Sequence, residues 1–351
     1  MTVKKDIKSM TLPELQQALS AQGLPLFRAA QIFRWLHVAG VDSFDKMTNL
    51  SKQLRETLAQ SYYIPYAAIE RKLVSHSDET VKYLFSLYDG ETVESVVMKY
   101  KYGYTICVST QVGCKMGCKF CASTLSGCVR NLAASEILSQ IHCAQNDMGV
   151  RISHVVLMGM GEPLDNYDNV MRFLELVSDE KGLHISARNI SLSTCGIVPH
   201  IRLLAQKKLQ ITLSVSLHAP NDAIRSTIMP VNRRWGVEEL LAACKEYTAL
   251  TSRRISYEYA MIEGVNDSDA CARELGSKLK GSLAHVNLIP VNKVKENTFQ
   301  KSGREQMNRF IEILKKYGVS ATVRRTLGSD INASCGQLRR SAAKAQKEVS
   351  K

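Results

Sequence analysis

The chain has 351 residues, 45% of them hydrophobic and 23% charged, and a formal net charge of +13, with 12 Lys or Arg against 4 Asp or Glu in residues 301–351. This composition is typical of a folded globular protein and favours a polyanionic partner, above all nucleic acid. It excludes a membrane-spanning chain, because no segment approaches about 20 uninterrupted apolar residues, and with no sign of a signal peptide we expect a cytoplasmic protein without a membrane partner.

Residues 1–65 are predicted to form a small helical accessory module. Thr11 and Glu14 have the spacing of a capping box at the start of a helix. A helical apolar stripe follows within residues 26–36, and Arg28 and Arg34 lie outside it. These two arginines make the module a candidate surface for nucleic acid.

Residues 66–104 are predicted to form a β-extension that links this module to the rest of the chain. Apolar and polar residues alternate on both sides of Asp89-Gly90, a dipeptide that indicates a two-residue hairpin turn. We therefore expect antiparallel strands between about residues 68 and 100.

Residues 105–340 repeat a strand followed by a helix. The predicted strands are 105–110, 154–159, 189–194, 211–218, 255–262, 285–291 and 321–325, and helices are expected at 134–147, 167–178, 236–250, 268–280 and 303–317. Alternating units of this kind form a parallel sheet with right-handed crossovers. About six units predict an α/β fold with an open, partial (β/α)6 barrel of the TIM type, and a doubly wound sheet is the alternative. Residues 341–351 form a polar, basic tail that we expect to be flexible.

Three of the ten cysteines, Cys114, Cys118 and Cys121, stand in the short stretch CKMGCKFC after the first predicted barrel strand. Reduced thiols in an intracellular protein often bind metal. A structural zinc site normally has four protein ligands, and Cys107, Cys128 or His142 could complete one. Three thiolates on a four-iron cluster instead leave one iron open for chemistry.

The spacing of these cysteines, with Phe120 directly before the third, resembles the signature of the radical S-adenosylmethionine superfamily. The resemblance implies one 4Fe-4S cluster held by Cys114, Cys118 and Cys121. It also implies that the open iron binds the amino and carboxylate groups of S-adenosylmethionine, whose reductive cleavage gives a 5′-deoxyadenosyl radical.

Polar groups at the ends of further predicted strands would complete the cofactor site. Gly161 and Glu162 match the run that binds the methionyl amine in this superfamily, and glycine there lets a ligand approach the backbone. The other candidates at strand ends are Ser193, Ser216, Leu217, His218 and Asn292.

Several ordered motifs narrow the resemblance to the RlmN/Cfr family of RNA methyltransferases. They are CVSTQVGCKMGCKFCAST, RNL, MGMGEPLDNYDNV, STCGIVP, SLHAPND, IRSTIMPVNRR, GVNDS, HVNLIPVN and DINASCGQL, which lie between residues 107 and 338. The resemblance to RlmN implies methylation of carbon 2 of adenosine in 23S rRNA, at the peptidyl-transferase centre, and in tRNA, next to the anticodon.

The same resemblance implies a ping-pong mechanism. Cys335 takes a methyl group from one S-adenosylmethionine, and a second molecule supplies the radical that removes hydrogen from the methylated sulfur. The resulting carbon joins adenine, Glu94 removes the ring proton, and Cys107 attacks Cys335 to form a transient disulfide that releases the product. Each turnover thus consumes two molecules of S-adenosylmethionine.

The family also implies partners. We expect 23S rRNA and tRNA as substrates, a reducing electron donor such as flavodoxin or ferredoxin, and a monomer. The excess of Lys and Arg would contact the phosphates of a folded RNA. The candidate phosphate contacts near Cys335 are Arg324, Arg325, Arg339 and Arg340.

Two alternatives stay open at the level of sequence. A Cfr-like enzyme that methylates carbon 8 would keep the cluster, both cysteines and the glutamate. A non-catalytic RNA-binding protein stabilised by zinc or an iron–sulfur cluster would not cleave S-adenosylmethionine, and it leaves the polar residues at the strand ends unexplained. No function is predicted for the remaining cysteines, which we interpret as structural: Cys128, Cys143, Cys195, Cys244 and Cys271.

Overall fold

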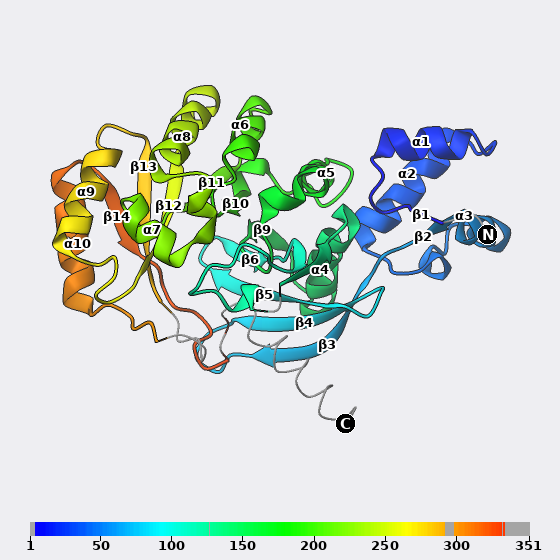
Figure 1. The fold of residues 1–351 in the computed structure, drawn as a ribbon. Coiled ribbons are helices and arrows are strands. Elements are labelled where there is room, and N and C mark those ends of the chain that lie inside the picture. The colour runs from blue at the N-terminus through cyan, green and yellow to red at the C-terminus, as the bar shows by residue number, and fades with distance from the viewer. Residues whose placement is uncertain (1–3, 126, 292–297, 332, 334–351) are drawn as a thin grey trace.

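One ten-stranded sheet forms the centre of the protein (Figure 1). The computed structural model describes residues 4–125, 127–291, 298–331 and 333. The strand order is β14-β13-β12-β11-β10-β9-β6-β5-β4-β3, in which β6 and β9 to β14 are parallel and β3 to β6 are antiparallel neighbours. The expected partial barrel and the expected β-extension therefore belong to one continuous sheet.

The elements follow each other in chain order. The α-helices are α1 (Leu12–Ser20), α2 (Leu26–Arg34), α3 (Lys52–Ser61), α4 (Ala134–Met148), α5 (Tyr167–Ser178), α6 (Val198–Gln206), α7 (Asp222–Ile228), α8 (Val237–Thr251), α9 (Asp269–Leu279) and α10 (Arg304–Lys316). The strands of the large sheet are β3 (Ala67–Val74), β4 (Val81–Leu87), β5 (Thr92–Tyr100), β6 (Gly103–Cys107), β9 (Ile152–Leu157), β10 (Ile190–Thr194), β11 (Thr212–Ser216), β12 (Ile255–Met261), β13 (Ala284–Pro290) and β14 (Ser320–Val323). Two small sheets pair β1 (Lys5–Asp6) with β2 (Tyr62–Tyr63) and β7 (Gln111–Gly113) with β8 (Cys128–Asn131).

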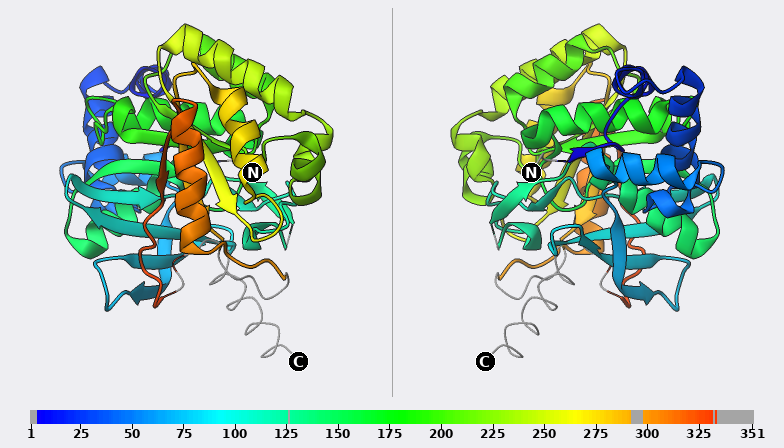
Figure 2. Two further views of the ribbon diagram at one scale, coloured as in Figure 1. Left: turned by 90° about the vertical axis from the view of Figure 1, so that its left-hand side faces the viewer. Right: turned by 90° about the vertical axis from the view of Figure 1, so that its right-hand side faces the viewer.

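The parallel part confirms the predicted partial (β/α)6 barrel. From β6 to β14 the strands lie in their order along the chain, with α4, α5, α6, α8, α9 and α10 in the successive crossovers. A doubly wound sheet would require the strand order to reverse, which it does not. At the edge of the sheet formed by β14, helix α10 lies alongside this last strand (Figure 2).

Strand β10 places its apolar side chains toward the helices and its serines on the opposite face. On β10, Ile190 and Leu192 are buried in the core, whereas Ser191 and Ser193 alternate with them and are only half-buried. Side chains of a strand alternate between its two faces, so this pattern makes the inner face polar at β10. A polar inner face can accept a ligand instead of filling the interior with core.

The N-terminal helices pack against the α4–α5 side of the barrel (Figure 1). The capping box predicted for α1 is confirmed, with Thr11 and Glu14 bonding each other's backbone N–H groups. Glu14 also forms an ion pair with Arg172 of α5 at 2.7 Å. Lys8 is buried and donates to Ser139 of α4 at 3.0 Å.

The antiparallel hairpin predicted around Asp89-Gly90 is present as β4 and β5. Its loop is longer than predicted, because Leu87 N–H donates to Glu91 O at 2.7 Å and encloses three residues instead of two. Gly90 has φ +84° and donates its N–H to Leu87 O at 2.9 Å, as in a type I turn followed by a left-handed residue.

No helix within the described residues is both long enough and apolar enough to cross a membrane.

Candidate active site

The three cysteines of CKMGCKFC lie in a loop held by the small β7–β8 sheet, which sequence patterns did not predict. Cys114 N–H donates to Gly127 O at 2.8 Å, and Thr124 Oγ1 donates to Cys118 O and Cys121 O. Gly113 enters the loop at φ +82°, where a Cβ would come within 2.0 Å of Gly127 O. Only glycine fits at this crossing of the two strands.

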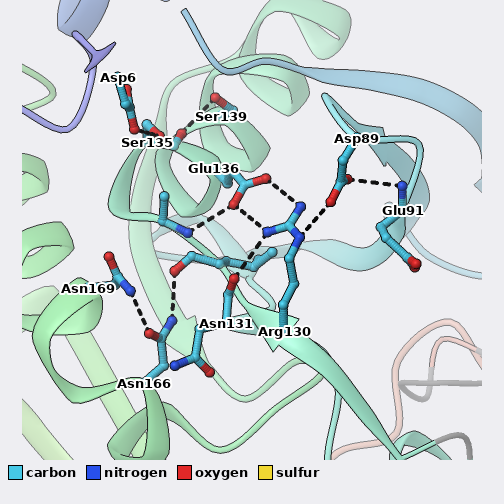
Figure 3. A network of polar contacts seen from close by, with 12 residues as sticks. Asp6, Asp89, Glu91, Arg130, Asn131, Ser135, Glu136, Ser139, Asn166 and Asn169 are labelled. Atoms are coloured by element: carbon cyan, nitrogen blue, oxygen red, sulfur yellow. Dashed lines mark hydrogen bonds and ion pairs between the residues drawn. The ribbon is translucent and has the colours of Figure 1, made fainter. Parts of the chain in front are cut away.

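The β7–β8 sheet is attached to its surroundings by Arg130 (Figure 3). Its guanidinium donates to both carboxylate oxygens of Glu136, at 2.8 and 2.9 Å, and to Asp89 at 2.6 Å. Glu136 also accepts from Ala133 N–H at the start of α4. Arg130 therefore joins the cysteine loop to α4 and to the tip of the β4–β5 hairpin.

The thiols of Cys114, Cys118 and Cys121 line a cavity of about 280 Å³ at the carboxyl ends of the parallel strands. This is the end at which barrel enzymes carry their chemistry. The cavity is also lined by Phe120, Met158, Gly161, Glu162, Ser193, Cys195, Ser216, His218, Glu258 and Arg324, among others.

Most of the cofactor residues predicted from the sequence meet at this cavity. Gly161, Glu162, Ser193, Ser216 and His218 all contribute to its wall. In contrast, the Leu217 side chain is buried in the hydrophobic core and is not among the lining residues.

Glu162 is a buried carboxylate with fixed orientation. It accepts from Cys195 N–H at 2.7 Å and from Leu164 N–H at 3.0 Å, and its side chain is 4% exposed. Burial raises the pKa of the Glu162 carboxyl, although these hydrogen bonds act in the opposite direction. A cationic ligand beside Glu162 would offset the cost of burying its negative charge.

His218 follows β11 by two residues and has a left-handed conformation, with φ +58°. Its Nδ1 accepts from Ala260 N–H at 2.9 Å, so the neutral ring carries its proton on Nε2. Burial lowers the pKa of His218 to about 3, which keeps the imidazole neutral. The ring packs edge-on against Phe120 of the cysteine loop, with centroids 4.7 Å apart.

The donor set fits a four-iron cluster. A cubane takes one cysteine per iron, so its thiolates surround the cluster instead of converging on one ion. Burial raises the pKa of Cys114 to about 12, so binding of a cluster must release thiol protons. Within the described residues, no group of three or more His, Cys, Asp or Glu is arranged to hold a metal ion.

Of the three candidate zinc ligands outside the loop, Cys128 pairs with Gly113 next to the loop but does not line the cavity, and the other two lie elsewhere. His142 is buried beneath the N-terminal helices, where its Nε2 lies 3.2 Å from His37 O. Cys107 is on β6, packed against Val96 and Met98.

Glu94, Lys82 and Cys107 lie on the inner face of the sheet. Glu94 and Val96 share one face of β5, and the register pairs Val96 with Lys82 on β4 and with Cys107 on β6. Lys82 Nζ lies 2.9 Å from Glu94 Oε2, and both side chains are 1% exposed. Glu94 is buried because the sheet continues on both sides of β5.

The segment before Cys335 returns to this face. Leu327 and Ala333 pack against the cluster formed by Val96, Met98 and Cys107. Asp330 accepts from Ser75 Oγ and His76 N–H, both at 2.8 Å. Cys335, Asn292, Arg339 and Arg340 themselves lie outside the described residues.

Met158 connects the cavity that contains the three cysteines with the face of the sheet that carries Cys107. It lines the cavity and also packs against the Cys107 cluster. Ser109 provides a second connection, since its Oγ donates to Glu94 O at 2.6 Å and accepts from Met160 N–H at 3.0 Å. Glu94 and Cys107 are thus linked structurally to the strand end that carries Gly161 and Glu162.

Sequence analysis missed three residues of the site. Cys195 was interpreted as structural, yet it lines the cavity, and its position at a strand end in STCG could have indicated this. Glu258 and Arg225 are buried, at 4% and 0% exposed, and no sequence pattern distinguishes them from surface charges. The other unassigned cysteines, Cys128, Cys143, Cys244 and Cys271, do not line the cavity.

Comparison with known proteins agrees with this geometry. A model of the radical SAM superfamily matches residues 108–273, and a model of the ribosomal RNA large subunit methyltransferase N-terminal domain matches residues 5–64. Two curated relatives carry the name "Probable dual-specificity RNA methyltransferase RlmN". The one from Clostridium perfringens (strain 13 / Type A) is 54% identical over 342 residues, 97% of this chain and 99% of its own. The one from Clostridium novyi (strain NT) is 53% identical over 336 residues, 96% of this chain and 98% of its own.

A solved structure shares the whole architecture. The crystal structure of a radical SAM methyltransferase from Sphaerobacter thermophilus is 44% identical, with a TM-score of 0.90, and the match covers 95% of this chain and 98% of that one. By the extent and identity of these matches, the chain belongs to the RlmN family of the radical SAM superfamily.

Proposed function

We propose that the protein methylates carbon 2 of adenosine in 23S rRNA, at the peptidyl-transferase centre, and in tRNA, next to the anticodon. The main support is the identity of more than half the residues, over nearly the whole chain, with relatives named dual-specificity RNA methyltransferases. The common inner face of Glu94 and Cys107, beside the cavity with three cysteines, supports the same function.

Cys114, Cys118 and Cys121 would hold a 4Fe-4S cluster, and Glu162 would accept from the amino group of S-adenosylmethionine. Gly161, Ser193, Ser216 and His218 would form the remaining wall around this cosubstrate, with Leu217 supporting it from the core. When bound, the cluster and two successive S-adenosylmethionine molecules supply a methyl group, an electron and a 5′-deoxyadenosyl radical.

Cys335 is the methyl carrier in this proposal. Its thiolate accepts the methyl group on sulfur, and this methyl loses one hydrogen atom before its carbon bonds to carbon 2 of adenine. The adduct then gives its carbon-2 proton to Glu94 and loses one electron, for which the oxidised cluster held by Cys114, Cys118 and Cys121 would be the acceptor. Cys107 attacks the Cys335 sulfur, so that a disulfide forms as the carbon–sulfur bond breaks. The released carbon receives the electron pair of that bond and a proton, which completes the methyl group.

RNA binding would use the basic surface of the chain. Arg324 lines the cavity and Arg325 follows it, so both are placed to approach a phosphate near the target base. On the N-terminal module, the Arg28 guanidinium lies 4.8 Å from the centroid of Phe27, whose side chain is 55% exposed. An exposed aromatic ring next to arginine is a typical stacking surface for RNA bases.

A reducing electron donor such as flavodoxin or ferredoxin would feed the cluster. A thiol reductant would reopen the disulfide between turnovers. We propose that the enzyme works as a monomer.

An anaerobic assay tests this function. The reconstituted protein is incubated with S-adenosylmethionine, dithionite and fragments of 23S rRNA or tRNA, and the digests are analysed by mass spectrometry. We expect 2-methyladenosine together with 5′-deoxyadenosine, and neither product from Cys335→Ala. Formation of 8-methyladenosine would instead identify a Cfr-like activity. Absence of S-adenosylmethionine cleavage in a protein with a full cluster would contradict an enzymatic role.

A further inference from the structure

Arg225 is a buried cation beneath the cofactor cavity. It belongs to α7 and has an exposed fraction of 0%. Its guanidinium donates to Leu217 O at 2.9 Å, to Ser216 O at 3.0 Å and to Cys195 O at 2.6 Å. A fourth bond, at 2.9 Å, goes to the side-chain oxygen of Asn232. Arg225 therefore joins the ends of β10 and β11, which carry the cavity wall.

The hydrogen-bond acceptors of Arg225 are all neutral. No carboxylate lies within 4.0 Å of its guanidinium in the part of the chain that the structure describes. Its neighbour Asp222 is engaged by Asn232 and by Val237 N–H at the start of α8. Burial of a cation without an anionic partner costs several kcal/mol, so an anion that arrives later would recover part of this cost.

The cysteine loop packs against the segment that carries this charge. Burial lowers the pKa of Arg225, whereas Cys195, Cys118 and the more distant carboxylate of Asp222 act in the opposite direction. The loop rests on the segment that contains Arg225, since Lys119 N–H donates to Ile228 O at 2.9 Å and a Cβ at Gly117 would lie 3.4 Å from Pro230. Cys118 is 8% exposed, so little solvent screens its interaction with the guanidinium.

We propose that Arg225 is a positioning residue that supplies the positive charge for the anionic iron–sulfur site and holds the strand ends that receive S-adenosylmethionine. This inference rests on the proposed cofactor set. The negative charge of three thiolates exceeds the positive charge of the cluster core, and reduction adds one more negative charge. A buried cation nearby stabilises the reduced form more than the oxidised form, so it raises the reduction potential of the cluster.

Two substitutions distinguish the effect of the Arg225 charge from the effect of its hydrogen bonds. Arg225→Lys keeps the positive charge but cannot reproduce the planar fork that reaches two strand ends. Arg225→Gln removes the charge and keeps an amide that can donate. Arg202→Gln is the matched control, because Arg202 is an exposed arginine paired with Glu246 on the outer helices.

Each anaerobically reconstituted variant is compared with the wild type by iron content, thermal melting, EPR-monitored redox titration and S-adenosylmethionine binding. We expect Arg225→Gln to shift the midpoint potential of the cluster to a more negative value. Arg225→Lys should keep the potential but bind S-adenosylmethionine at least tenfold more weakly. Arg202→Gln should match the wild type in both measurements.

Equal midpoint potentials in the wild type and a fully loaded Arg225→Gln would overturn the proposal. A glutamine variant that melts normally but loads no iron supports it, because the cluster then requires the charge. If Arg225→Gln does not fold, Arg225→Lys alone tests the proposal. A midpoint potential equal to that of the wild type supports the proposal, and a shifted midpoint potential contradicts it. A wild type that holds no cluster would refute the proposed function instead.

Discussion

Lys82 Nζ and Glu94 Oε2 form an ion pair at 2.9 Å in which both side chains are 1% exposed. The pair lies across adjacent strands on the face that also carries Cys107. Breaking a buried ion pair costs far more stability than breaking an exposed one.

Lys82→Met should therefore lower the free energy of unfolding by about 3–5 kcal/mol, measured by urea denaturation. The matched control is Lys99→Met, because Lys99 forms a 2.6 Å pair with Glu79 in which the side chains are 47% and 60% exposed. The control should lose less than about 1 kcal/mol. Equal losses in the two variants would show that burial of the Lys82–Glu94 pair has no energetic consequence.

Glu94→Gln tests the proposed base. Without a carboxylate to take the carbon-2 proton, the reaction should stop after the carbon–carbon bond forms, so a covalent protein–RNA adduct should accumulate. The adduct is visible as a shifted band on a denaturing gel. Glu79→Gln, in the connection between β3 and β4, is the control for the loss of an exposed carboxylate and should turn over normally. Full turnover by Glu94→Gln would exclude the role assigned to Glu94.

Cys107→Ala should also trap an adduct, but for a different reason. The ring proton has left by then, and no thiolate remains to attack the Cys335 sulfur. Digestion and mass spectrometry should find adenine linked through one carbon to Cys335, with the carbon-2 proton absent. An adduct that still carries this proton would place Cys107 earlier in the reaction.

Gly113 should be essential for cluster loading. A Cβ at this position would lie 2.0 Å from Gly127 O, so Gly113→Ala should displace the cysteine loop and reduce the iron content of the purified protein. Gly90→Ala is the matched control, because Gly90 has nearly the same φ, +84° against +82°, but has open space around its Cβ position. Equal iron contents in Gly113→Ala and Gly90→Ala would mean that the cysteine loop still binds iron after the displacement.

His37 should make the protein sensitive to acid. Burial lowers the pKa of His37 to about 3 from an ordinary value of 6.5. The unfolded chain thus binds a proton that the folded state excludes, and stability falls as the pH drops from 6.5 toward 3. The slope from one such group is at most about 1.4 kcal/mol per pH unit.

His37→Phe removes this contribution while preserving a ring that can pack against Phe33. Denaturation at pH 7.5 and 5.5 should show a smaller loss of stability in the variant than in the wild type. Identical losses would mean that His37 is already charged in the folded state.

Local patterns were sufficient to predict much of the fold. The capping box at Thr11 and the helix at residues 167–178 depend on contacts within a few positions, and both agree with the structure. The regular alternation of strands and helices likewise predicted the partial barrel. The predicted length of the loop at Asp89 was wrong, because the backbone hydrogen bond between Leu87 and Glu91 sets this length and the turn dipeptide does not.

The features that sequence analysis missed depend on residues far apart in the chain. Asp330 anchors the segment before Cys335 to Ser75, a contact across 255 positions. The burial of Glu94 requires β4 and β6 on either side, and the acceptors of Arg225 come from two strand ends brought together only by the fold. No periodicity or spacing predicts such contacts.

Transfer of an isotopically labelled methyl group tests the role of Cys335 most directly. The enzyme is supplied with S-adenosylmethionine whose methyl group carries only deuterium, and the methylated adenosine and 5′-deoxyadenosine are analysed by mass spectrometry. If the methyl group passes through Cys335 and loses a hydrogen atom there, the adenosine methyl must retain two deuterium atoms and the 5′-deoxyadenosine must gain one. Retention of all three deuterium atoms in the RNA would mean direct displacement and would contradict the mechanism.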